Sequence, residues 1–126
     1  REGFEGSGLH MKREIGDFIE DIVDAMDKAL KFTEGMSYEE FAHDEKTLFA
    51  VVRAIEIIGE AVKNIPEDVK KKYPEIPWKG MAGMRDKVIH GYFGVDAKVV
   101  WDTVKRRIPE LKPLFERMLD ELERRQ

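Results

Sequence analysis

An arginine, a histidine and a tyrosine lie within eight residues of one another in the second half of the sequence: Arg85, His90 and Tyr92. An imidazole can give or take a proton near neutral pH. A guanidinium keeps its charge and can hold two phosphate oxygens in its planar fork. Together these groups meet the minimum for cutting an RNA phosphodiester without a metal, which needs a base, an acid and a cation at the crowded phosphorus.

One helix alone makes a poor pocket from these residues. Five helical residues turn the chain by roughly 500°, which leaves Arg85 and His90 about 140° apart around the helix and about 7.5 Å apart along it. Two copies related by a two-fold axis would bring both residue types to one cleft. Apolar Met81, Met84 and Ile89 lie near the same turn, and we therefore expect a homodimer. On the pattern alone, a capped helix end with a hydrogen-bonded histidine is the alternative interpretation.

Other conspicuous side chains are expected to have structural roles. His43 lies among acidic residues, with no second histidine or cysteine at metal-ligand spacing, and we predict an exposed polar residue. Trp78 and Trp101 are interpreted as core anchors rather than base-stacking platforms, and Met81 and Met84 as packing residues rather than ligands. We predict no metal and no cofactor.

The composition narrows the class of protein. The sequence holds 126 residues and no cysteine, which excludes disulfide scaffolds, thiolate zinc sites and cysteine nucleophiles. No apolar run approaches the roughly 20 residues that span a bilayer, and no signal-peptide pattern opens the chain, so we expect a cytoplasmic protein with no membrane partner. Residues 1–10 show no helical period and contain a Gly-Ser-Gly stretch. We interpret them as an expression-tag remnant, which leaves a single domain over residues 11–126.

Charge is distributed unevenly along the chain. The net charge of −4 argues weakly against a nucleic-acid partner, but residues 11–60 carry −7 and residues 61–126 carry +4. The Arg85–His90 motif lies in the basic half. Basic runs at 70–72 and 105–107 can guide an RNA backbone, although such runs are typical of solvated helix faces as well.

Apolar residues recur at three- and four-residue spacing in the first half, which predicts amphipathic helices. The first covers about residues 15–30, with Gly35 as its stop. Ser37 and Glu40 form a capping-box signature. The helix that they begin is expected to continue as far as Val62 and to be central, because it is apolar around much of its circumference.

The second half contains shorter helical segments. Pro66 can begin a short helix through residue 72, and a turn-rich linker follows at 73–77. The next helix is predicted over residues 78–90, with Gly91 and Gly94 as breakers.

Asp96 is a good N-cap for the helix after that. We expect Pro109 and Pro113 to kink or restart the chain before a last amphipathic helix. No segment alternates with a period of two, so the sequence predicts an all-α, up-and-down bundle of four to five main helices.

Several segments in a consistent order resemble the HepT-type HEPN family, and the resemblance covers residues 11–126. The most specific of them is PWKGMAGMRDKVIHGYFGVD at 77–96, which is followed by VVW at 99–101. The others are found at 38–41, 44–47, 53–61 and 73–78.

The resemblance implies an α-helical bundle that dimerises and acts as a metal-independent RNase, the toxin of a toxin–antitoxin pair. The family motif is an arginine, a polar residue, a few variable residues, a histidine and often x-Tyr. Arg85, Asp86, His90 and Tyr92 match it. The polar position is usually Asn in close relatives, and we expect the charge of Asp86 to lessen the attraction of the site for phosphate.

The resemblance also implies a partner, a minimal nucleotidyltransferase antitoxin that silences the toxin by attaching AMP to the tyrosine matching Tyr92. Each AMP would add a phosphate charge and bulk at the mouth of the expected cleft, where it would repel an RNA backbone.

The leading hypothesis is therefore a dimeric endoribonuclease that cuts an RNA such as tRNA or mRNA. Arg85 would stabilise the phosphate, His90 would transfer protons, Asp86 would orient neighbouring groups and Tyr92 would be the modification switch. The alternatives are a non-catalytic module that binds a nucleotide or the nucleotidyltransferase through the same cleft, and a purely structural helical interaction domain.

Overall fold

The protein is an α-helical bundle. The computed structural model describes residues 7–90 and 96–124, and side chains over 15–87 and 96–124. No strand occurs in those residues, which confirms the all-α prediction. The elements in order are α1 (Ser7–Phe32), α2 (Tyr38–Ala42), α3 (Glu45–Lys63), α4 (Glu67–Lys71), α5 (Trp78–His90), α6 (Ala97–Asp102), a π-helical turn η3 (Thr103–Arg107) and α7 (Ile108–Arg124).

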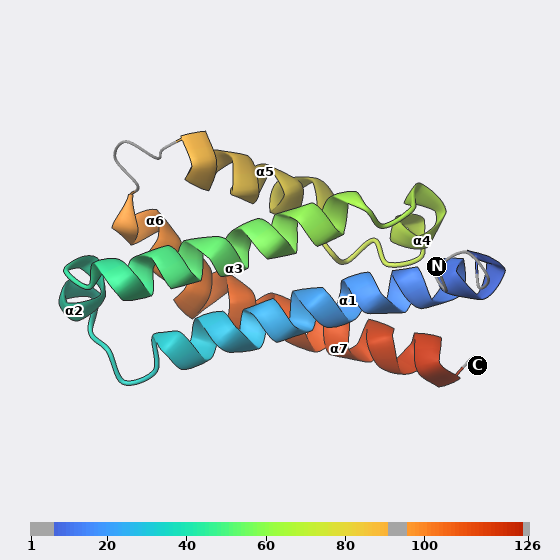
Figure 1. The fold of residues 1–126 in the computed structure, drawn as a ribbon, viewed down its shortest axis with the longest axis horizontal. Helices are drawn as coiled ribbons and strands as arrows, with labels where there is room; N and C mark the ends of the chain where they lie inside the picture. The colour runs from blue at the N-terminus through green and yellow to red at the C-terminus, as the bar shows by residue number, and fades with distance from the viewer. Residues whose placement is uncertain (1–6, 91–95, 125–126) are drawn as a thin grey trace.

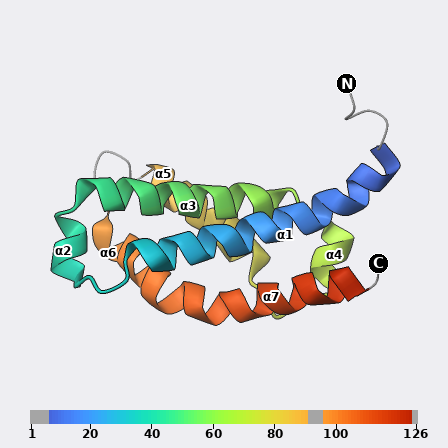
Figure 2. The same cartoon turned by 60° about the horizontal axis from the view of Figure 1, so that its bottom comes forward.

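The long helices run up and down in sequence order (Figure 1). Helix α3 packs between α1 and α5, and the other side of α1 packs against α7. A second view shows α1 and α7 side by side, with α2 at the end of the bundle where α1 is joined to α3 (Figure 2). The predicted up-and-down bundle is confirmed, and α3 is central as expected.

One hydrophobic core joins the apolar stripes of these helices. In α1 the predicted stripe is fully buried at Ile19, Ile22, Met26 and Ala29. Burial of such side chains is the main force that holds a bundle together. The largest fully buried side chains are Phe41, Phe115, Ile19, Ile22, Met26, Ile55, Ile58, Met81, Ile108, Met118, Val51 and Val62.

The single helix predicted from Ser37 to Val62 is wrong, because the chain breaks into α2 and α3. The capping box itself is confirmed: the Ser37 hydroxyl accepts from the Glu40 amide at 3.1 Å, and the Glu40 carboxylate accepts from the Ser37 amide at 2.9 Å. The break follows from Asp44, whose carboxylate accepts from the Thr47 amide at 3.1 Å and the Thr47 hydroxyl at 2.8 Å. An aspartate that caps a new helix competes with continuation of the old one.

The middle of the chain follows the prediction closely. Pro66 is the N-cap of α4, one position before the first helical residue. Turns follow at 73–77. Helix α5 has the predicted bounds, whereas the proposed breakers Gly91 and Gly94 lie outside the described residues.

The C-terminal third differs from the prediction at its prolines. Asp96 caps α6 as predicted, accepting from the amides of Lys98 at 3.0 Å and Val99 at 3.4 Å. Of the predicted kink or restart at Pro109 and Pro113, the restart does not occur: the chain continues helically from α6 through η3 into α7, which contains Pro113. A kink there stays a prediction. The wide π turn ends immediately before α7, where Pro109 has no N–H to extend the helical ladder.

Helix α1 begins at Ser7, so residues 7–10 are helical, contrary to the absence of a helical period there. The interpretation of residues 1–10 as an expression-tag remnant stays a prediction. In the described part of the chain, no helix is both long enough and apolar enough to cross a bilayer.

Candidate active site

The predicted phosphate-binding arginine lies where α5 meets α3. Gly59 of α3 faces Arg85 of α5 so closely that a Cβ built on the glycine would stand 2.5 Å from the Arg85 Cβ. The Arg85 Cγ and Cδ atoms would each lie 3.2 Å from that Cβ. Real Cβ atoms do not approach other atoms this closely, so the stem of Arg85 lies along α3 only because residue 59 has no side chain.

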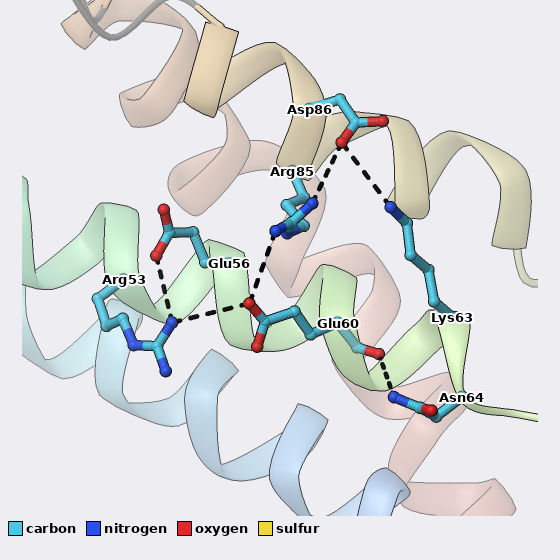
Figure 3. A network of polar contacts seen from close by, with 7 residues as sticks. All are labelled: Arg53, Glu56, Glu60, Lys63, Asn64, Arg85 and Asp86. Carbon is cyan, nitrogen blue, oxygen red and sulfur yellow. Dashed lines mark hydrogen bonds and ion pairs between the residues drawn. The ribbon is translucent and has the colours of Figure 1, made fainter.

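The guanidinium of Arg85 emerges between two carboxylates (Figure 3). Its Nη1 donates to Asp86 Oδ1 at 3.4 Å, and its Nη2 lies 3.8 Å from Glu60 Oε2. The side chain is 28% exposed, while the Nε atom is buried and has no hydrogen-bond partner among the described residues. The inner edge of the guanidinium therefore faces protein and its outer nitrogens reach the surface.

These contacts belong to a chain of alternating charges across α3 and α5. Arg53 Nη1 lies 3.3 Å from Glu56 Oε1 and 3.9 Å from Glu60 Oε2. At the other end, Lys63 Nζ lies 3.8 Å from Asp86 Oδ1. Three cations and three carboxylates balance, and all six side chains are partly exposed. Surface pairs of this kind are each worth about 0–1 kcal/mol, so an incoming phosphate can compete for the guanidinium.

An open groove of about 610 Å³ lies next to this network, between α1 and α3. Arg53 and Glu60 stand on its α3 side, and Ala25, Ala54 and Ile57 are among its apolar lining residues. Glu60, which lines this groove, is the residue that connects it to Arg85.

The structure brings together only part of the predicted motif. Arg85 and Asp86 lie side by side at the α3 contact, and the backbone of His90 belongs to the same helix. The side chain of His90 and the whole of Tyr92 lie outside the described residues, so their roles stay predictions.

Two site residues, Gly59 and Glu60, escaped the sequence reasoning. They lie within the 53–61 segment that resembles the HepT-type HEPN family. A glycine in a helix interior costs stability relative to alanine, so its presence there indicates a packing or functional reason.

The structural roles predicted for the tryptophans are confirmed. Trp78 packs edge-on against Phe115 with 5.5 Å between ring centroids, and its Nε1 donates to the carbonyls of Lys70 and Tyr73. Trp101 packs against Phe41 at 5.2 Å. Met81 is buried and Met84 packs at the edge of the core, as predicted.

His43 is exposed as predicted, with its Nδ1 2.8 Å from the Glu39 carbonyl. Within the described residues, no three His, Cys, Asp or Glu side chains gather in a way that could hold a metal ion.

Within each of the two basic runs, the side chains differ in their exposure and contacts. Lys70 pairs with Glu67 at 3.5 Å and lies over the Trp78 ring, while Lys71 and Lys72 are exposed. In the second run the Lys105 ammonium is occupied by contacts inside the protein: its Nζ donates to the Thr33 carbonyl at 3.2 Å and lies 5.0 Å from the Trp101 ring centroid. The neighbouring residues 106 and 107 are exposed arginines.

The fold and site define a class: an all-α bundle with a surface arginine seated between two helices. Sequence comparison identifies the family within it. The chain belongs to the Ribonuclease HepT-like family, whose family model matches residues 22–118 and so covers α3, α5 and the whole Arg85–Tyr92 motif.

Similar proteins carry ribonuclease names. The chain is 56% identical over 108 residues to "Probable ribonuclease HepT" of Thermococcus cleftensis, covering 86% of this chain and 98% of that protein. It is 53% identical over 112 residues to "Putative RNase MJ1216" of Methanocaldococcus jannaschii, covering 89% of this chain and 93% of that protein. No solved structure matches the chain.

Proposed function

We propose that the protein is a metal-independent endoribonuclease that uses Arg85 and His90 at a dimer cleft. The observation that carries the proposal is the position of Arg85 at the contact between α3 and α5. Its stem is packed against α3, its charged end reaches the surface, and it shares helix α5 with His90. Membership of the Ribonuclease HepT-like family supports RNA as the substrate.

The proposed reaction needs a base, an acid and a cation. One His90 imidazole removes the proton of an RNA 2′-hydroxyl, and the resulting oxygen attacks the adjacent phosphorus. Arg85 stabilises the charge that develops on the phosphorane oxygens. The bond to the 5′ oxygen breaks, and that oxygen takes a proton from a second, protonated imidazole. Because one histidine cannot hold both protonation states at once, His90 of the second copy supplies the acid.

RNA cleavage by the purified protein in EDTA tests this reaction. We expect cleavage without added metal, and a loss of about 100-fold or more in Arg85→Ala and His90→Ala. Cleavage that survives His90→Ala, or that requires a divalent cation, would contradict the mechanism.

In this proposal the protein is the toxin of a cytoplasmic toxin–antitoxin pair. A minimal nucleotidyltransferase neutralises it by transferring AMP to Tyr92. Intact mass measured after co-expression with such an enzyme should increase by whole AMP units, and Tyr92→Phe should remove the increase. An unchanged mass would argue against this regulation.

A second candidate is a non-catalytic module that binds a nucleotide or the nucleotidyltransferase. The observation in its favour is that Asp86 and Glu60 both offset the charge of Arg85. It predicts a tight complex with the partner and no RNA cleavage at any protein concentration, so the EDTA assay separates the two candidates.

A further inference from the structure

We propose that Glu60 is a positioning residue for Arg85, holding the guanidinium from the neighbouring helix so that it is ready to receive a phosphate. The inference deepens the proposed ribonuclease function and rests on it for the kinetic part of its test. Glu60 lies one residue after Gly59 on α3, and its carboxylate lies 3.8 Å from Arg85 Nη2 (Figure 3).

The freedom left to Arg85 is small and lies at the end of the side chain. The contact with Gly59 confines Cβ, Cγ and Cδ, and in the part of the chain that the structure describes, the buried Nε has no partner that could fix the guanidinium plane. Rotation of that plane is therefore limited by the two carboxylates at Nη1 and Nη2. When one of these carboxylates is removed, the guanidinium is held by one ion pair instead of two.

Glu60 and Asp86 do not contribute equally. Asp86 is the next residue on the same helix, so its 3.4 Å contact with Arg85 ties the guanidinium only to α5. Glu60 reaches Arg85 from α3, so its ion pair ties the guanidinium to the helix that already seats the stem. A catalytic cation is effective only when it is held near the reacting geometry, and a misplacement of about 1 Å can cost about 100-fold in rate.

A carboxylate near a phosphate site also repels the substrate, and Arg53 lessens this cost. Arg53 Nη1 lies 3.9 Å from Glu60 and 3.3 Å from Glu56. The positive charge of Arg53 offsets the negative charge of Glu60 at the rim of the α1–α3 groove. Glu60 can then hold Arg85 without turning the surface strongly acidic.

The kinetic test compares Glu60→Gln with Glu56→Gln under single-turnover conditions. Both variants remove one negative charge from α3 beside Arg53, but only Glu60 reaches Arg85. We expect Glu60→Gln to lower the maximal single-turnover rate constant about tenfold, with the half-saturating concentration changed less than about twofold, and Glu56→Gln to match the wild type. A rise in activity in Glu60→Gln would show competition with substrate instead, and would overturn the proposal.

A double-mutant cycle distinguishes positioning from general structure. In an Arg85→Ala background, Glu60→Gln should have no further effect on the residual rate, because the group that it positions is gone. An equal loss in both backgrounds would overturn the proposal.

Nitrogen NMR of the Arg85 guanidinium provides a readout that needs no RNA. The signals are assigned by their loss in Arg85→Ala. We expect restricted guanidinium rotation in the wild type and in Glu56→Gln, and fast rotation in Glu60→Gln. Unchanged rotation in Glu60→Gln would overturn the proposal. If rotation changes as expected but the wild type cleaves no RNA, the ribonuclease function fails and the positioning of Arg85 by Glu60 stands.

Discussion

Arg85 has a stem fixed by packing and a charged end held by exchangeable ion pairs. The first property comes from Gly59, which lets α3 and α5 meet at the arginine. The second comes from distances of 3.4–3.8 Å to partly exposed carboxylates. Such a residue keeps its place in the free protein and can still transfer its donors to a phosphate.

Gly59→Ala tests the packing of that stem. The new Cβ would overlap the Arg85 Cβ, so α5 must shift. We expect the free energy of unfolding to fall by about 1–3 kcal/mol and RNA cleavage to be lost. Urea denaturation measures the first effect. Gly16→Ala in α1 is the matched control, since no atom of the described side chains lies within 4 Å of its new Cβ. It should be stabilised by up to about 1 kcal/mol; equal stability losses in both variants would refute the close contact at Gly59.

Substitutions in the second basic run should separate effects on protein stability from effects on RNA binding. Lys105→Ser loses the bond to the Thr33 carbonyl and the contact with the Trp101 ring, for a cost of about 1–2 kcal/mol. Replacing Arg106 and Arg107 together with Ser should leave stability within about 0.5 kcal/mol. If this pair guides RNA, the double variant should reduce the salt dependence of binding by about one unit per lost phosphate contact. An unchanged slope would remove these arginines from the RNA-binding surface.

At the scale of elements, the boundary between α2 and α3 depends on the charge of the Asp44 side chain that caps α3. The Thr47 amide, then the Thr47 hydroxyl, donate to the Asp44 carboxylate and lower its pKa below the usual aspartate value. The ionised cap therefore contributes stability above the unfolded-state pKa of about 3.9, and the contribution is lost as the pH falls through the lower folded-state value.

Acid unfolding of Asp44→Asn checks this contribution. Asparagine can cap the helix but does not titrate, so the wild type should lose stability more steeply than the variant below about pH 4. Above about pH 5 the two curves should run parallel. Thr47→Val, which lacks the second donor, should show a smaller difference from Asp44→Asn. Identical slopes in all three proteins at low pH would contradict the role of the cap.

At the scale of the whole molecule, the proposed site requires two chains. Light scattering should give twice the 14.7 kDa chain mass, and a monomer at micromolar concentration would count heavily against a composite site. A sharper test mixes wild-type and His90→Ala chains after denaturation and refolding together. Because the proposed reaction takes one imidazole from each chain, the mixed dimer should be inactive and activity should fall with the square of the wild-type fraction. Activity that falls only in proportion to the wild-type fraction would show that one His90 is enough and would contradict the composite site.

Local signals explain most of what was predicted correctly. The capping box at Ser37 and the cap at Asp96 both depend on side chains within a few residues of the backbone that they satisfy. Predictions failed where two local signals competed. Asp44 ended one helix by capping the next, and the chain passes Pro109 after a π turn without the restart that was one of its two predicted outcomes.

By itself, the sequence determined the helical class, the apolar stripes and the Arg85–His90 spacing, because periodicity and motif order are properties of the chain. The tertiary structure alone decided that Arg85 is seated on Gly59 and lies between Glu60 and Asp86. Gly59 and Glu60 are far from Arg85 along the chain. They meet it only because α3 and α5 pack side by side, and the depth of that packing depends on the whole core.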